Sequence, residues 1–237
     1  QQACFFPHSM VMDQNAILKS EANFKPKRYL DKTGAEYKET GYGLSKSQVE
    51  YMQTISDWLT KGAKTDREKM LKIHNWVAAN IYYDDFAHKY GRAKTNPYYL
   101  AKSIADGYAT KSVCNGYSSL VLILARCAKI PCRQGKGHAI YLPQQSWESE
   151  GKVLSEVDHF WNEAYVDGRW MTIDATRDTS SKYTEDGEWL KYDFIRYNYF
   201  DPSDESLAAT HLTIGYKDPI IPTEPTTTTE KAVEKKS

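Results

Sequence analysis

The sequence predicts a single domain of the α+β class, and three observations support this. Two stretches between residues 47 and 81 carry apolar residues at helical spacing, and the run from Cys114 to Ala128 is apolar around most of a helix. An Asp-Gly pair, Asp167 and Gly168, marks a tight turn between two short strands. With 237 residues, 41% of them hydrophobic, the chain suffices for one large core and is too short for two complete domains.

Charge and composition exclude several classes of partner. The 31 Lys and Arg residues balance the 31 Asp and Glu residues, so no net field favours nucleic acid or an anionic membrane. No run approaches the roughly 18 apolar residues that span a bilayer. We therefore expect no nucleic-acid partner and no transmembrane segment, and the oligomeric state is left open.

The two ends of the chain differ from its centre. We expect an N-terminal extension packed on the core (1–45), a main domain (46–220) and a disordered Thr- and Pro-rich tail or linker (221–237), since the tail is nearly free of apolar residues. The chain begins QQACFF without Met, which suggests that an upstream segment such as a signal peptide is removed. These features favour a secreted or cell-surface protein; for the tail, an ordinary disordered C-terminus is the alternative.

The cysteines and histidines form no metal motif. The four cysteines include no CxxC pair and the six histidines no HExxH, so we expect neither a metal nor a cofactor. In an oxidising compartment a disulfide could form among Cys4, Cys127 and Cys132, which would leave Cys114 as the odd thiol; the pairing is left open.

Two amphipathic helices are expected to cover the core. The first begins at a capping box of Ser47 and Glu50, and its apolar stripe is Val49, Met52, Ile55 and Leu59. The second begins with Thr65 and Glu68, and its stripe is Met70, Ile73, Trp76 or Val77, and Ile81. We interpret His74 in the second helix as a structural or surface residue, and residues 82–110 as a long, partly helical loop.

A third helix, from about Cys114 to Ala128, should run through the centre of the domain. Five consecutive apolar residues, Leu120 to Leu124, make it apolar on most faces. Cys114 lies in its first turn, where the helix dipole favours a thiolate, with Ser112 as the expected N-cap. Gly116 leaves room for a close approach. From this helix alone, an inert buried cysteine is the alternative.

The hairpin places a histidine beside a carboxylate. If Val166 pairs with Arg169 across the Asp-Gly turn, Trp161 faces Asp174. Alternation along the strands puts His159 and Asp174 on one face as diagonal neighbours, within reach of a hydrogen bond. An imidazole held by a carboxylate is what a general base requires.

These segments resemble a known family. The blocks VCNGYSSLVLILARCAKIPCR (113–133), HFWNEAYVDGRW (159–170) and TIDAT (172–176) look like the Cys, His and Asp blocks of the transglutaminase-like superfamily, and KIHNWVAANIYYD (72–84) is similar to the helix that precedes them. The resemblance covers about residues 47–178. It implies a papain-like α+β core in a secreted bacterial member, with the helix that carries the thiol packed on an antiparallel sheet.

The resemblance also implies roles for individual residues. The catalytic Cys, His and Asp of the family correspond to Cys114, His159 and Asp174. The backbone N–H of Cys114 is the expected first oxyanion donor, and no second donor is assigned. Trp161, Asn162 and His138 are expected near the substrate cleft. His138 is also the rival histidine, although it has no hairpin carboxylate as a partner; Glu163 and Asp178 are expected to be structural salt-bridge partners.

Three functions are compatible with these residues. We favour a thiol enzyme that acts on amide bonds of proteins or peptides, including cell-wall peptides, as a protease, amidase or deamidase. A glutamine acyl transferase that cross-links proteins is the second. A catalytically idle binding or scaffold module on a cell surface is the third.

Overall fold

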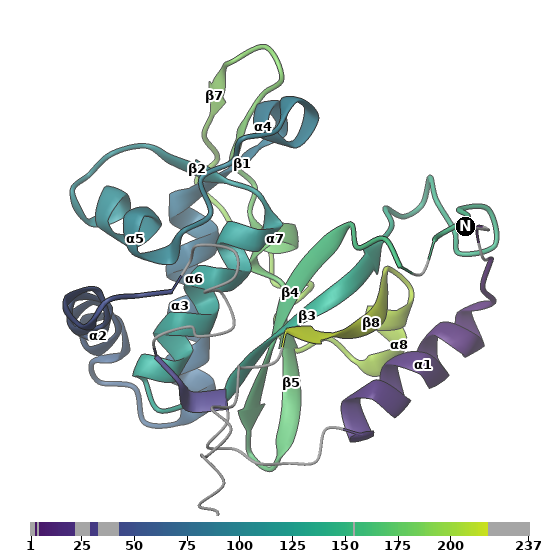
Figure 1. The fold of residues 1–237 in the computed structure, drawn as a ribbon, viewed down its shortest axis with the longest axis horizontal. Helices are drawn as coiled ribbons and strands as arrows, with labels where there is room; N and C mark the ends of the chain where they lie inside the picture. Colours follow the sequence, from purple (N-terminus) through teal and green to yellow (C-terminus); the bar gives the residue numbers. More distant parts are fainter. Residues whose placement is uncertain (1–2, 4, 22–28, 33–42, 154, 218–237) are drawn as a thin grey trace, which may run out of the picture.

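The computed structural model describes residues 3, 5–21, 29–32, 43–153 and 155–217 and has mixed α+β architecture (Figure 1). The helices are α1 (His8–Glu21), α2 (Lys46–Thr60), α3 (Asp66–Asn80), α4 (Asp85–Tyr90), α5 (Pro97–Ala105), α6 (Cys114–Cys127), α7 (Ala175–Asp178) and α8 (Asp204–Ala208). The strands are β1 (Ile81–Asp84), β2 (Thr110–Ser112), β3 (Cys132–Ala139), β4 (His159–Val166), β5 (Arg169–Ile173), β6 (Lys182–Tyr183), β7 (Trp189–Leu190) and β8 (His211–Lys217).

Helix α6 is the centre of the domain, as the sequence predicts. All six residues from Leu120 to Ala125 have no exposed surface, because α2, α3 and α5 surround the helix on one side and strands β3 and β4 close it on the other. Burying a stretch that is apolar on every face is the main hydrophobic contribution to this core. The confirmed arrangement is a central helix packed on an antiparallel sheet.

That sheet has the order β5-β4-β3-β8, with every neighbouring pair antiparallel. Val166 pairs with Arg169 and Asn162 with Ile173, so the register expected from the Asp-Gly turn is confirmed. Asp167 and Gly168 both have positive φ, 52° and 80°, as a type I′ turn requires. The short turn therefore fixes which β4 and β5 side chains share a face.

A second, smaller sheet was not expected from the sequence. Its order is β2-β1-β6-β7, and β1 pairs in parallel with both β2 and β6. Residues 82–110, interpreted as a partly helical loop, contain α4 and α5 but also contribute to β1 and β2. Strands of two to four residues are too short to show a period in sequence.

Two of the expected helix caps are wrong. The N-cap of α2 is Ser45, which forms a capping box with Gln48; both residues lie two positions before the expected Ser47 and Glu50. The cap of α6 is Val113 rather than Ser112, because the Ser112 hydroxyl donates to the Lys94 carbonyl at 2.5 Å.

Two other details at helix starts concern Thr65 and Gly116. Thr65 caps α3 as expected, accepting from the Glu68 N–H at 3.1 Å. A Cβ on Gly116 would lie 1.9 Å from the Ser112 Oγ, so Gly116 makes room for Ser112.

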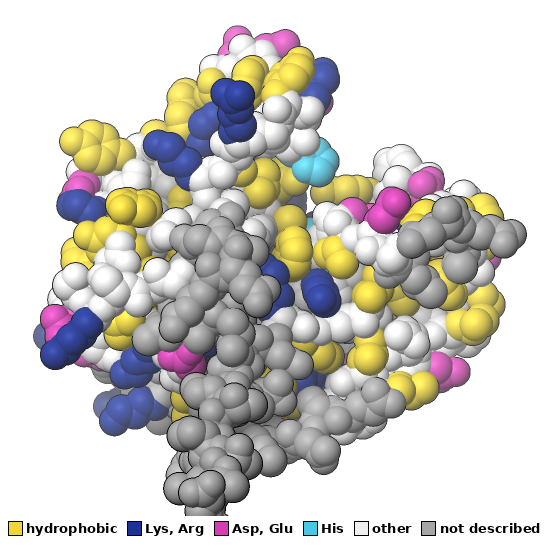
Figure 2. All heavy atoms as spheres, in the orientation of Figure 1, with side chains coloured by type: hydrophobic (Ala, Val, Ile, Leu, Met, Phe, Trp, Pro, Cys, Tyr) yellow, Lys and Arg dark blue, Asp and Glu magenta, His cyan; other side chains and the backbone are white. Residues whose placement is uncertain are grey.

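The N-terminal extension contributes α1, which packs across β8 and α8 at the far edge of the main sheet (Figure 1). Figure 2 shows a notch between the part of the molecule that carries α4 and β7 and the part that carries β3 and β4. Within the described ranges, none of the helices is both long and apolar enough to cross a membrane. The tail expected at 221–237 lies outside the described residues.

Candidate active site

Cys114 is the first residue of α6 and is partly exposed. The N-cap Val113 supplies no side-chain hydrogen bond, so the first amides of the helix are not capped. The start of α6 is held against β3, where Gln134 Nε2 donates to Asn115 Oδ1 at 3.1 Å. The thiol therefore lies on a rigid helix end beside the positive end of its dipole.

His159 and Asp174 lie together, as the hairpin register predicts. Nε2 of His159 lies 2.6 Å from Oδ2 of Asp174, and both side chains are nearly or fully buried. Asp174 is also the N-cap of α7, where Oδ1 accepts from the Arg177 backbone N–H at 3.1 Å. Because Nε2 of His159 faces the carboxylate, Nδ1 is the ring nitrogen left for Cys114.

Electrostatics favour a charged imidazole in this position. Burial opposes the charged form of His159, but the Asp174 carboxylate, and then the hydrogen bond and charge of Cys114, outweigh it and raise the pKa of His159 to about 10. Burial also opposes the charged Asp174, yet its hydrogen bonds and charge interactions with His159 and His211 hold its pKa well below the usual range. The structure thus brings Cys114, His159 and Asp174 into one interacting group.

His211 is a member of this group that the sequence interpretation missed. Its Nε2 lies 2.9 Å from the same Oδ2 of Asp174, and its Nδ1 lies 2.8 Å from the Thr210 hydroxyl. Since an ionised carboxylate only accepts, both histidines present Nε2–H to Asp174. Burial, which is complete, lowers the pKa of His211 to about 4 despite the carboxylate, so His211 is neutral at pH 7.

Among the described residues, one group of His, Cys, Asp and Glu brings ligand atoms within 4.8 Å of one another: His159, Asp174 and His211. Imidazole nitrogens with a carboxylate are ligands that Zn²⁺ accepts. Here, however, both Nε2 atoms already donate to the single oxygen Oδ2 at 2.6 and 2.9 Å. The donor set is therefore satisfied by its own hydrogen bonds, and we interpret it as a network that orients His159.

Trp161 and Asn162, expected near the cleft, are both buried, and the Trp161 ring stacks beside the His159 imidazole with centroids 6.0 Å apart. Trp161 is 1% exposed, and a Cβ on Gly135 would lie 2.7 Å from its indole nitrogen. Asn162 is equally buried and donates to the Ser118 carbonyl of α6 at 2.9 Å. Neither lines the cavity described below, and nor do Cys114, His159 and Asp174.

His138 differs from its expected environment. It has a carboxylate partner after all: its Nδ1 lies 2.9 Å from Asp158 Oδ2, while its Nε2 lies 3.1 Å from the Val153 carbonyl. With both ring nitrogens occupied, His138 has none left for a thiol. It too is nearly buried.

The other residues considered in the sequence have structural roles. Glu163 binds the buried Arg133 at 2.6 Å, and Asp178 binds His74 at 2.9 Å, as expected for ion-pair partners.

Cys127 and Cys132 are buried and form no disulfide with each other, and Cys4 lies outside the described residues. Burial raises the pKa of Cys127 to about 11, which makes that thiol unreactive at neutral pH.

Comparison with known proteins agrees with the Cys, His and Asp blocks recognised in the sequence. A family model described as the transglutaminase-like superfamily matches residues 53–175. The chain is 29% identical over 139 residues to mouse kyphoscoliosis peptidase and 30% identical over 125 residues to the human protein. Those matches cover 56% and 52% of this chain but only 20% and 17% of the relatives, so the chain spans a small part of their length.

Solved structures give a weaker likeness. A provisionally assigned cysteine protease from Cytophaga hutchinsonii is 19% identical with a TM-score of 0.44, over 72% of this chain and 43% of that one. The family model, by contrast, covers more than half of the chain, from within α2 to the start of α7. On that match, this chain belongs to the transglutaminase-like superfamily.

Proposed function

We propose that this chain is a thiol enzyme that breaks amide bonds of peptides or proteins, as a protease, amidase or deamidase. The observation that carries the proposal is the interaction of His159 with Asp174 on one side and Cys114 on the other. A nucleophile, a base and a group that orients the base are the parts that covalent amide cleavage requires.

The first half of the reaction would form an acyl-enzyme. The Cys114 thiolate attacks the amide carbonyl carbon, a C–S bond forms, and the carbonyl π electrons move to oxygen. The uncapped N–H of Cys114 at the start of α6 donates to this oxyanion. When the carbonyl re-forms, the C–N bond breaks, and the His159 imidazolium gives its Nδ1 proton to the leaving nitrogen.

The second half would release the acyl group. Neutral His159 takes a proton from water, the resulting hydroxide attacks the thioester carbon, and the C–S bond breaks to restore the thiolate. Asp174 accepts from Nε2 throughout, so Nδ1 is the nitrogen that exchanges protons. A carboxylic acid and an amine, or ammonia from a glutamine side chain, are the products.

The similar mammalian proteins carry the name peptidase, which supports hydrolysis over cross-linking for this chain. The proposal is tested with a glutamine-containing peptide, with and without the primary amine glycine methyl ester, followed by mass spectrometry. Shortened or deamidated peptide with wild type, and unchanged peptide with Cys114→Ala, is the expected result.

Incorporation of the amine as the main product would instead identify a glutamine acyl transferase. If a peptide library shows no product with wild type under any of these conditions, the proposed enzyme activity is refuted.

A further inference from the structure

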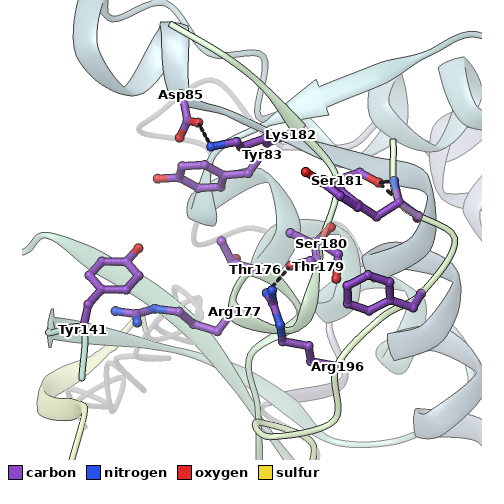
Figure 3. Close-up of a pocket in the computed structure, with 12 residues that line it drawn as sticks. Tyr83, Asp85, Tyr141, Thr176, Arg177, Thr179, Ser180, Ser181, Lys182 and Arg196 are labelled. Carbon is purple, nitrogen blue, oxygen red and sulfur yellow. Dashed lines mark hydrogen bonds and ion pairs between the residues drawn. The ribbon is translucent and has the colours of Figure 1, made fainter. Parts of the chain in front are cut away.

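A cavity of about 470 Å³ lies next to the short helix that Asp174 caps. Figure 3 shows Thr176 and Arg177 of α7 on one side of it, Tyr83 and Lys182 across from them, and Tyr141 at one end. Nothing in the reaction outlined above uses these side chains.

The cavity lies beside the group that orients His159, because the lining residues Thr176 and Arg177 follow Asp174 in α7; Cys114 itself is not among the lining residues. Burial is the main reason that the pKa values of Tyr83 and Tyr141 are raised, and the charge of Cys114 adds to the effect in both. Two side chains on different sides of the cavity therefore lie within electrostatic range of one sulfur. Arg177 is also tied to the site, since its backbone N–H donates to Asp174.

The cavity walls carry more positive than negative charge. Lys182 lies 3.6 Å from Asp85, so these two charges offset each other. Arg177 and Arg196 also line the cavity, and neither has a carboxylate partner in the described part of the chain. The Arg177 guanidinium lies 3.7 Å above the Tyr141 ring, and Arg196 donates to the Thr179 carbonyl at 3.2 Å.

Two donors in the lining are buried and unused. Within the described residues, Nε of Arg177 and Oγ of Ser180 have no hydrogen-bond partner although neither atom reaches solvent. Buried donors without an acceptor are rare, because each has lost its water without replacement. Both residues line the cavity, so an acceptor there would be close to a donor that has no partner among the described residues.

We propose that this cavity is a subsite for a carboxylate of the substrate, either an acidic side chain or the free C-terminus of a peptide whose amide bond Cys114 attacks. The planar guanidinium of an arginine matches a carboxylate, and the hydroxyl of Ser180 adds a donor. The inference rests on the proposed function, because it takes Cys114 as the reacting group. It adds that peptides with a negative charge near the scissile bond are preferred.

The test compares two alkylating reagents of similar size at Cys114, anionic iodoacetate and neutral iodoacetamide. Their rate ratio cancels any change in the thiol itself and reports the local preference for a carboxylate. We expect Arg177→Gln to lower the iodoacetate-to-iodoacetamide ratio by about three- to tenfold, as expected for one nearby charge partly screened by solvent. Arg169→Gln removes the same charge from an exposed arginine paired with Asp201, and should leave the ratio unchanged.

Protection by peptides identifies the source of the carboxylate. Four hexapeptides with a blocked N-terminus and a central glutamine are compared as inhibitors of iodoacetamide labelling. The residue beside the glutamine is Glu or Gln, and the C-terminus is a free acid or an amide. We expect at least one acidic peptide to protect Cys114 at a concentration about tenfold lower than the neutral peptide. The arm that protects shows whether the side chain or the C-terminus binds.

An unchanged ratio in Arg177→Gln, or equal protection or none from all four peptides, overturns the subsite. Alkylation needs no turnover, so this result is separate from the proposed function. A lowered ratio with acidic-peptide protection but no amide cleavage would keep the subsite and reject the enzyme. Amide cleavage with an unchanged ratio would keep the proposed enzyme activity and reject the subsite.

Discussion

Replacing Asp174 with Asn separates the charge of this side chain from its shape. Oδ2 accepts from Nε2 of both His159 and His211, at 2.6 and 2.9 Å, while Oδ1 accepts from the Arg177 N–H. An amide keeps one oxygen for Arg177 but presents NH₂ to the two imidazoles, and NH₂ cannot accept from Nε2–H. We therefore expect His159 to move its proton to Nδ1, the nitrogen that faces Cys114.

The structure gives the direction of the effect on His159. Asp174 is the strongest of the groups that raise the pKa of His159 to about 10 against the opposing effect of burial. Burial lowers this pKa and Asp174 raises it most, so without the carboxylate we expect the pKa of His159 to fall by several units. In the worked serine-protease example, losing the triad carboxylate costs about 10⁴ in turnover, and we expect a fall of about 10³ to 10⁴ here.

The assay combines turnover of an amide or activated ester, thermal unfolding, and ¹⁵N NMR of the His159 imidazole. Asp158→Asn is the matched control, because Asp158 holds the buried His138 at 2.9 Å in the same kind of pair. It should leave turnover and the His159 signals unchanged. If Asp174→Asn unfolds at the wild-type temperature, keeps the imidazolium signal and retains full turnover, the orienting role of Asp174 is refuted.

Three further predictions concern reactivity and stability. At pH 6, iodoacetamide should label Cys114 at least tenfold faster than Cys127, whose pKa burial raises to about 11; equal labelling, measured by peptide mapping, would mean that Cys114 has no special environment. Because burial lowers the pKa of His211 to about 4, the unfolded state takes up a proton on this side chain before the folded state does as pH falls. The free energy of unfolding of wild type should therefore drop by about 1.5 kcal/mol between pH 6.5 and 5, and His211→Gln should not show this drop. Equal drops for the two proteins in parallel urea titrations would contradict the prediction. Glu163→Gln should lower the free energy of unfolding by about 3–5 kcal/mol, because it leaves Arg133 buried without its carboxylate, and an unfolding midpoint equal to wild type would refute that role.

The part of the site that is local in sequence could be predicted. The Asp-Gly turn restricts the backbone to conformations that fix the β4–β5 register, and this register brings His159 and Asp174 to the same end of the hairpin. The consecutive apolar residues of α6 likewise identify the central helix, because no exposed helix tolerates them. In both cases neighbouring residues carry the whole signal.

The part that depends on distant pairing could not be predicted. His211 lies next to Asp174 because β8 pairs with β3, which is more than 70 residues away in sequence. The residues of β8, HLTIGYK, do not indicate which strand it pairs with. The Ser112 hydroxyl faces the Lys94 carbonyl for the same reason, since a chain segment 18 residues away competes with the helix end for it. The cationic cavity also combines side chains from β1, α7 and the segment after it, which are separate in sequence.

The most direct test of the central claim is the pre-steady-state reaction with p-nitrophenyl acetate, which acylates an activated thiol whatever the natural substrate. We predict a burst of one equivalent of p-nitrophenolate, one acetyl group located on Cys114, and loss of the burst in both Cys114→Ala and His159→Gln. Acetylation spread over Cys127 and Cys132, or a burst of the same size in His159→Gln, would contradict the account, because the thiol would then react without the base that Asp174 holds beside it.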